Sequence, residues 1–101
     1  MAFVEFAKAG DIPAGTLKEY KVQGVEIMVA NIGGAYYAIG RKCSHASGDL
    51  SKGRLDGNVV ICPRHGSRFD VTSGKCVGGP AKKDEPSYQV EVEGGSLKVN
   101  I

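Results

Sequence analysis

The sequence has little net charge, no long apolar run and only two histidines. Of its 101 residues, 13 are lysine or arginine and 11 are aspartate or glutamate, which gives a net charge of +2. So small a charge gives no reason to expect nucleic acid or an anionic membrane as a partner. The longest apolar run, around Val25 to Ala30, has the length of a β-strand and not of a membrane span. We therefore expect neither partner.

The N-terminal segment lacks the organisation of an export signal. Met1 to Asp11 carries the acidic Glu5 early and has no basic stretch followed by an apolar one. The three cysteines are an odd number, which argues against a disulfide scaffold. We expect a cytoplasmic protein whose thiols stay reduced as metal ligands or reactive groups. Its modest core would gain stability from a metal centre.

Long apolar patterns with a helical period are also scarce. Fifteen glycines and short segments that alternate or are β-branched predict strands joined by tight turns. The sequence predicts an all-β fold, a small antiparallel sandwich or barrel. The expected strands are Phe3 to Phe6, Leu17 to Val22, Val25 to Asn31, Ala35 to Ile39, Val59 to Ile61, Arg68 to Val71, Tyr88 to Glu93 and Leu97 to Ile101.

The middle of the chain differs in composition from its two ends. Between Arg41 and about Lys83 the predicted strands become short and glycine becomes frequent. We expect one domain, residues 1–101, in which a sheet scaffold, 1–40 and 84–101, carries an inserted subdomain, about 41–83. The charged run Lys82 to Glu85 is interpreted as a solvated loop.

Each of the two histidines closely follows a cysteine. His45 stands two residues after Cys43, and His65 stands three residues after Cys62. A thiolate and an imidazole at such spacing can converge, and the turn within Arg54 to Ile61 would let the two loops face each other. Four ligands of this kind fit a structural zinc ion or a two-iron, two-sulfur cluster. A compact zinc finger usually takes both cysteines from one knuckle and both histidines from one helix, whereas here each loop holds one of each.

The stretches "CSHASG" and "CPRHGSRFDVTSGKCVGGPA" resemble the two cluster-binding loops of the Rieske iron–sulfur family, especially those of the small ferredoxins that serve ring-hydroxylating dioxygenases. The resemblance covers about residues 41–81, and the flanking strands agree with the family only in order and length. It implies a Rieske-like fold with an inserted cluster-binding subdomain and one [2Fe–2S] cluster. Cys43 and Cys62 would bind one iron, and His45 and His65 would bind the other.

The resemblance also assigns roles to neighbouring positions. Ser67 stands where the family has a serine that donates a hydrogen bond to a cluster sulfur, although it could equally cap a turn. Pro80 falls where the family places a proline-bearing loop over the cluster. Respiratory Rieske proteins have disulfide-bonded cysteines at the positions of Gly48 and Arg64, and a tyrosine at that of Phe69. Without that bridge and that hydroxyl, we expect a potential in the lower part of the family's range of roughly −150 to +300 mV.

No sequence pattern indicates catalysis by this chain alone. It has no G-x-S-x-G, G-x-G-x-x-G or P-loop sequence, and ligation would use both histidines. The resemblance implies a monomeric one-electron carrier that links a flavoprotein reductase to a terminal oxygenase or another redox acceptor. The alternatives are a small Rieske subunit of a larger redox enzyme and a zinc-stabilised interaction module. Cys76 is expected to be a free thiol that is packed or partly exposed.

Overall fold

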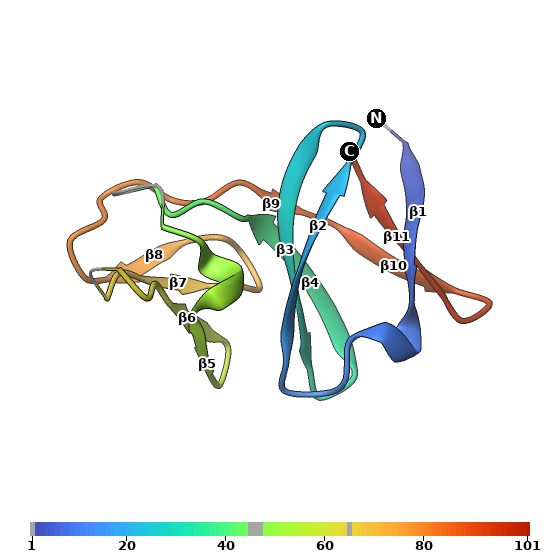
Figure 1. The fold of residues 1–101 in the computed structure, drawn as a ribbon, viewed down its shortest axis with the longest axis horizontal. Helices are drawn as coiled ribbons and strands as arrows, with labels where there is room; N and C mark the ends of the chain where they lie inside the picture. Colours follow the sequence, from blue (N-terminus) through green and yellow to red (C-terminus); the bar gives the residue numbers. More distant parts are fainter. Residues whose placement is uncertain (1, 45–47, 65) are drawn as a thin grey trace.

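The computed structural model describes residues 2–44, 48–64 and 66–101, which form eleven strands and two short 3₁₀ helices (Figure 1). The predicted all-β class is confirmed. No helix in the described part of the chain is long and apolar enough to cross a membrane. The elements are β1 (Phe3–Lys8), η1 (Ala9–Asp11), β2 (Leu17–Val22), β3 (Val25–Ile32), β4 (Ala35–Gly40), η2 (Leu50–Lys52), β5 (Arg54–Asp56), β6 (Val59–Ile61), β7 (Arg68–Asp70), β8 (Cys76–Gly78), β9 (Ser87–Tyr88), β10 (Val90–Glu93) and β11 (Ser96–Asn100).

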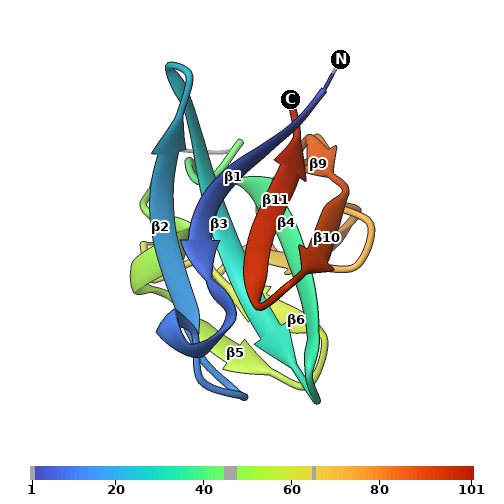
Figure 2. The same cartoon turned by 90° about the vertical axis from the view of Figure 1, so that its right-hand side faces the viewer.

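The strands form three antiparallel sheets, which follow one another along the long axis of the molecule (Figures 1 and 2). The first sheet has the order β1-β11-β10, the second β2-β3-β4-β9, and the third β5-β6-β7-β8. The second sheet lies between the other two, and it is covered on both faces. The third sheet is made entirely of strands from the middle of the chain.

Strand β3 supplies side chains to two separate cores. Ile27 and Val29 pack with residues of the first sheet, such as Leu97, whereas Met28 and Ala30 pack toward the third sheet. Successive residues of a strand point to opposite faces, so a strand covered on both sides is apolar throughout. This explains the apolar run from Ile27 to Ala30. Because β3 belongs to both cores, the first sheet and the third sheet are joined through it.

Most of the predicted strands are present, and the differences have local causes. The predicted strand Tyr88 to Glu93 is wrong as one element, because the chain changes sheets at Gln89: β9 pairs with β4, and β10 pairs with β11. The strands β5 and β8 were not predicted. Each has three residues, too few for alternation to be read from the sequence. Tyr36 and Tyr37 pack against different cores, as expected for neighbours on a strand.

Candidate metal centre

Two loops of equal length each begin with a cysteine and are closed by the same type of backbone hydrogen bond. The amide of Cys43 donates to the carbonyl oxygen of Gly48 at 2.7 Å, and the amide of Cys62 donates to that of Ser67 at 2.8 Å. We call residues 43–48 the first loop and residues 62–67 the second loop.

Paired backbone fixes the base of each loop. The second loop connects β6 to β7, where Ile61 is paired with Arg68. The first loop starts and ends at an isolated bridge between Lys42 and Asp49, and the amide of Leu50 donates to the carbonyl of Arg41 at 2.8 Å. Antiparallel pairing therefore fixes the two ends of each loop, although the loops lie far apart in the sequence.

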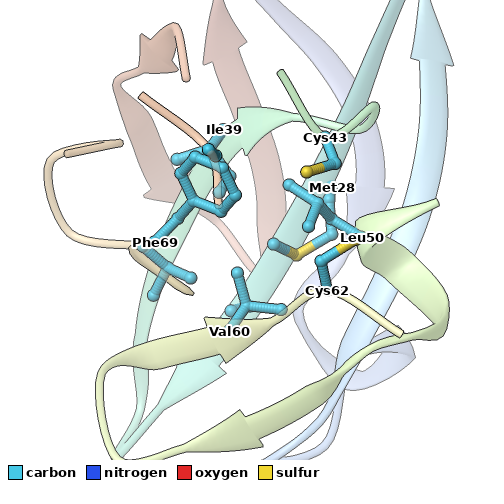
Figure 3. Packing of buried hydrophobic residues seen from close by; sticks show 10 residues of the cluster. Met28, Ile39, Cys43, Leu50, Val60, Cys62 and Phe69 are labelled. Atoms are coloured by element: carbon cyan, nitrogen blue, oxygen red, sulfur yellow. The ribbon is translucent and has the colours of Figure 1, made fainter. Parts of the chain in front are cut away.

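The two loop cysteines lie in one buried cluster (Figure 3). Cys43 is 3% exposed and Cys62 is 2% exposed, and neither forms a disulfide. Their neighbours in this cluster are Met28 from β3, Leu50 from η2 and Val60 from β6. The fold thus brings the two predicted thiol ligands to the same part of the core. The other two predicted ligands, His45 and His65, lie outside the described residues.

The first loop approaches the second where glycine removes a side chain. A Cβ atom built on Gly48 would lie 2.8 Å from the Sγ atom of Cys62 and 3.2 Å from the Cβ atom of Arg64. The latter distance is close to the Cβ–Cβ distance of about 3.8 Å in disulfides. Gly48 and Arg64 are the positions at which the resemblance to respiratory Rieske proteins implies a disulfide. The present pair cannot form one, and the glycine leaves space beside the Cys62 sulfur.

Ser67 connects the second loop to the segment around Pro80. Its side chain is fully buried, and its hydroxyl oxygen accepts a hydrogen bond from the amide of Ala81 at 3.1 Å. The Cys76 thiol, which is partly exposed as predicted, donates to the carbonyl of Ala81 at 3.1 Å. Both contacts hold Ala81, so exposed Pro80 lies next to a fixed residue. The hydroxyl of Ser67 has therefore a structural role, beside the predicted role of donating to a cluster sulfur.

The same segment is also bound to the first loop. The hydroxyl of Ser44 donates to the carbonyl of Lys83 at 2.7 Å. At the other end, Gly79 has a φ of +82°, and a Cβ atom on it would lie 2.5 Å from the Cα atom of Ser67. Residues 79–83 therefore link the two loops across the outside of the buried cysteines.

Comparison with known proteins agrees with this arrangement. The family model of the Rieske [2Fe-2S] domain matches residues 2–91 of the chain. The chain belongs to the Rieske family. Membership of this family implies one [2Fe–2S] cluster, and not the zinc ion that the spacing of the ligands alone had left open.

Relatives of the same length are electron-transfer components. The chain is 37% identical over 91 residues to the ferredoxin component of naphthalene 1,2-dioxygenase/salicylate 5-hydroxylase systems from a Ralstonia species, covering 90% of this chain and 88% of the relative. The ferredoxin of carbazole 1,9a-dioxygenase from Nocardioides aromaticivorans superimposes with a TM-score of 0.93 at 32% identity, over 98% and 97% of the two chains. A chain in a complex of reduced oxygenase and oxidised ferredoxin of carbazole 1,9a-dioxygenase matches with a TM-score of 0.89 at 32% identity, over 96% and 91%.

The described residues suit such a cluster. Cys43 and Cys62 are buried, form no disulfide and come from two loops, and two thiolates are the donor set that one iron of a Rieske cluster requires. Gly48 leaves room beside one of these sulfurs. When bound, the cluster takes up and releases single electrons. The chain contributes the two loops, the segment 79–83 that links them, and a core that keeps water away from the thiols.

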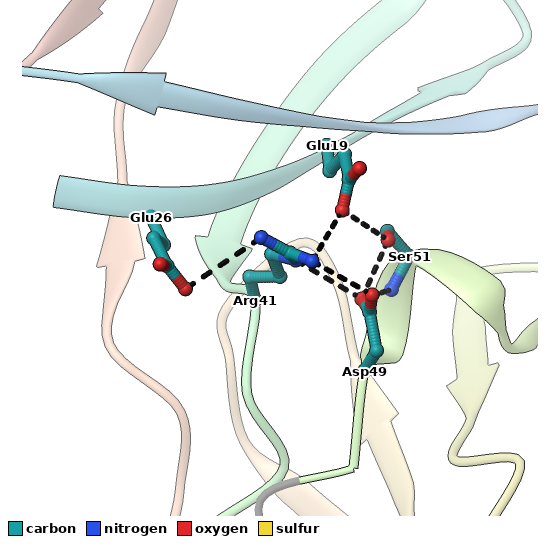
Figure 4. Close-up of polar contacts among 5 residues, drawn as sticks. All are labelled: Glu19, Glu26, Arg41, Asp49 and Ser51. Carbon is teal, nitrogen blue, oxygen red and sulfur yellow. Dashed lines mark hydrogen bonds and ion pairs between the residues drawn. The ribbon is translucent and has the colours of Figure 1, made fainter.

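An ionic network that sequence analysis missed surrounds the base of the first loop in this Rieske protein (Figure 4). The guanidinium of Arg41 donates twice to the carboxylate of Asp49, from Nε at 3.2 Å and from Nη2 at 3.0 Å. Nη2 also lies 2.7 Å from Glu19 of β2, and Nη1 lies 3.7 Å from Glu26 of β3. The network therefore connects the first loop to two strands of the second sheet. Asp49 also accepts the amide of Ser51 at 3.0 Å, an N-terminal cap of η2.

The pKa values of the pair reflect this geometry. The hydrogen bond from Arg41 lowers the pKa of Asp49 to about 2, with a further contribution from Ser51. The same hydrogen bond raises the pKa of Arg41. Asp49 is thus ionised throughout the neutral range. A carboxylate whose pKa is lowered by folding stabilises the folded state above its unfolded pKa, and this contribution is lost as the pH falls from about 4 to about 2.

Glu85 corrects the interpretation of residues 82–85 as a solvated loop. Lys82, Lys83 and Asp84 are exposed, but Glu85 is only 6% exposed. Burial raises its pKa to about 7, and a hydrogen bond from the backbone amide of Ser44 opposes the shift. A Cβ atom on Gly40 would lie 2.6 Å from its Oε1 atom, so the carboxyl group occupies space that this glycine leaves. Folding therefore buries the carboxyl group of Glu85, which would be ionised at neutral pH if it were exposed to water.

We expect Asp49→Asn to lower the free energy of unfolding by about 1–2 kcal/mol, because the amide cannot form an ion pair with Arg41. The loss should stay constant from pH 6 to pH 8, since Asp49 is ionised over that range. Thermal denaturation of the holoprotein measures it. Asp56→Asn, at an exposed position of β5, is the control and should leave the midpoint unchanged. Equal midpoints for all three proteins would show that the network adds nothing.

We expect Glu85→Gln to stabilise the protein increasingly as the pH rises from 5 to 8. The raised pKa means that the folded state resists ionisation of Glu85, so the wild type loses stability over this range while the glutamine variant does not. The gain should reach about 1–2 kcal/mol at pH 8. The measurement is the denaturation midpoint across the pH series, with Glu91→Gln on exposed β10 as control. A difference that does not change with pH would contradict this assignment.

We expect Gly79→Ala to be much more harmful than Gly57→Ala. Both glycines have positive φ, +82° and +59°, so both substitutions strain the backbone by about 1 kcal/mol. Only at Gly79 would the new methyl group also collide with backbone, at Ser67, whereas nothing lies within 4 Å at Gly57. Gly79→Ala should therefore lower the midpoint further and speed the loss of the visible spectrum on heating. Similar behaviour of both variants would mean that the close approach of residues 79–83 is unimportant.

Proposed function

We propose that this protein is the ferredoxin component of a ring-hydroxylating dioxygenase system, carrying single electrons from a flavoprotein reductase to a terminal oxygenase. The observation that supports this most directly is its match, over nearly the full length of both chains, to ferredoxins of such systems. The chain thus has the size of a separate carrier. It acts in an oxidoreductase system and is not an enzyme alone.

The proposal assigns the cluster ligands to the four residues that the sequence pattern selected. Cys43 and Cys62 bind one iron through sulfur, and His45 and His65 bind the other through nitrogen. The burial of both thiols in one cluster supports the first half of the assignment. The placement of each histidine in the same loop as one of these cysteines supports the second half. Ser67 and Pro80 flank the site, Ser67 by fixing Ala81 against the second loop.

The proposal includes the organisation and the location of the protein. One domain, 1–101, would consist of a scaffold, residues 1–40 and 84–101, and a cluster-binding subdomain, about 41–83. That β5 to β8 form a sheet of their own supports this division. We further propose that the protein works in the cytoplasm as a monomer, for which the absence of a disulfide among the three cysteines is the main support.

Replacement of the proposed ligands tests the assignment. We expect Cys43→Ser, Cys62→Ser, His45→Ala and His65→Ala each to lose most iron and acid-labile sulfide, together with the visible absorption. Cys76→Ser is the matched control, because Cys76 is a free thiol bonded to the carbonyl of Ala81, and it should retain a full cluster. Iron and sulfide analysis with electron paramagnetic resonance of the reduced protein gives the answer. Full cluster content in either histidine variant would refute the proposed ligand set.

A further inference from the structure

The small net charge conceals a strong separation of charge along the chain. Residues 41–83 contain nine lysines and arginines but only three aspartates and glutamates, a net charge of +6. Residues 1–40 and 84–101 contain four basic and eight acidic residues, a net charge of −4. The overall value of +2 is therefore the difference between two oppositely charged parts.

Four of the eight acidic residues outside the middle segment nevertheless lie beside it. Glu19 and Glu26 contact Arg41, Asp84 accepts the amide of Cys76, and Glu85 accepts the amide of Ser44. The charge separation in space is therefore smaller than the separation along the chain.

The longest extent of the molecule is 39 Å, and Figure 1 shows the third sheet and the two loops at one end of this axis. At the other end are β1 and β10, which carry Glu5, Glu91 and Glu93. Because this length is several times the screening length of about 8 Å in physiological salt, a partner near one end feels mainly the charge of that end.

Four exposed basic residues stand beside the loops, and we call Lys42, Arg64, Lys82 and Lys83 the basic rim. Lys42 directly precedes Cys43, and Arg64 lies against Gly48 of the first loop. The carbonyl of Lys83 accepts the hydroxyl of Ser44, which places the rim across the first loop. The rim therefore surrounds the loops that hold the cysteines.

Acidic side chains also lie near the rim, because Glu26, Asp84 and Glu85 line one pocket together with Lys42 and Lys83. Lys42, Lys82 and Lys83 form no ion pair with any residue that the structure describes. Asp84 follows Lys83 closely, and its carboxylate accepts the amide of Cys76. Asp49 is paired with Arg41, so that its charge is compensated. Among the described residues, the ammonium groups of Lys42, Lys82 and Lys83 are therefore the part of the rim that is available to a partner.

We propose that the basic rim is a docking surface for an acidic protein surface on a redox partner of this ferredoxin. This inference rests on the proposed function, since a docking surface beside the cluster matters only if electrons pass there. Complementary charge raises the rate of encounter between the exposed lysines of the rim and an acidic surface. Net negative charge at the opposite end disfavours a long polyanion such as nucleic acid.

The experiment measures the rate of electron transfer from the reduced holoprotein to two cytochromes that differ in charge. Acidic cytochrome b5 stands for an acidic partner, and basic cytochrome c is its opposite. Each accepts one electron, and its haem absorbance reports the rate. The variant Lys82→Glu/Lys83→Glu reverses half of the rim. The matched control, Lys18→Glu/Lys21→Glu, makes the same charge change at exposed positions of β2.

We expect the rate with cytochrome b5 to fall as salt is added, and to fall about tenfold in Lys82→Glu/Lys83→Glu at low salt. The same variant should react faster with cytochrome c. The control should change either rate by less than about twofold. All proteins compared must show equal visible spectra and iron content.

Two different failures are distinguishable. A wild-type protein without iron and sulfide would overturn the proposed function itself. A normal cluster combined with salt-independent reduction of cytochrome b5, or with equal rates in the rim variant and the control, would overturn the docking surface and leave the carrier function intact.

Discussion

The site depends on one buried cluster of side chains between the second and third sheets. Cys43 and Cys62 lie outside the strands of the described residues. Their positions are set by the close packing of Met28, Leu50 and Val60 around them (Figure 3). Since both sulfurs share these neighbours, a change in the packing moves both together. Stability of the core and formation of the cofactor site are therefore coupled.

The remainder of the fold supports this cluster through β3. Its side chains alternate between the two cores, so that Met28 cannot shift without also moving Ile27 and Val29 on the other face. The first sheet thus stiffens a site with which its own residues share no core. Hydrogen bonds to Ser44 and Ser67 add a second support, because they fix residues 79–83 to both loops. Packing positions the sulfurs from inside, and these bonds position the loops from outside.

Sequence patterns predicted the features that are encoded locally. Alternation and glycine turns located β2 and most of β3 and β4, and the Cys-His spacing selected two loops whose cysteines the fold buries in one cluster. The missed features depend on residues distant in sequence. Nothing in the sequence around Arg41 indicates that folding places the carboxylates of Glu19 and Asp49 beside it. The sequence predicted that Glu85 is solvated, because no neighbouring residue in the sequence shows that its carboxyl group packs against Gly40.

These missed acidic groups connect the stability of the loops with the charge of their surface. Asp49 stabilises the base of the first loop. Its negative charge is balanced by Arg41, so it contributes little to the electrostatic potential that a partner meets. Burial raises the pKa of Glu85 to about 7, so near neutral pH a large share of the molecules carry no charge there. Asp49 is thus paired and Glu85 is buried, while the lysines near the site remain at the surface. The positive field around the loops follows from how the fold uses its carboxylates as much as from the number of lysines.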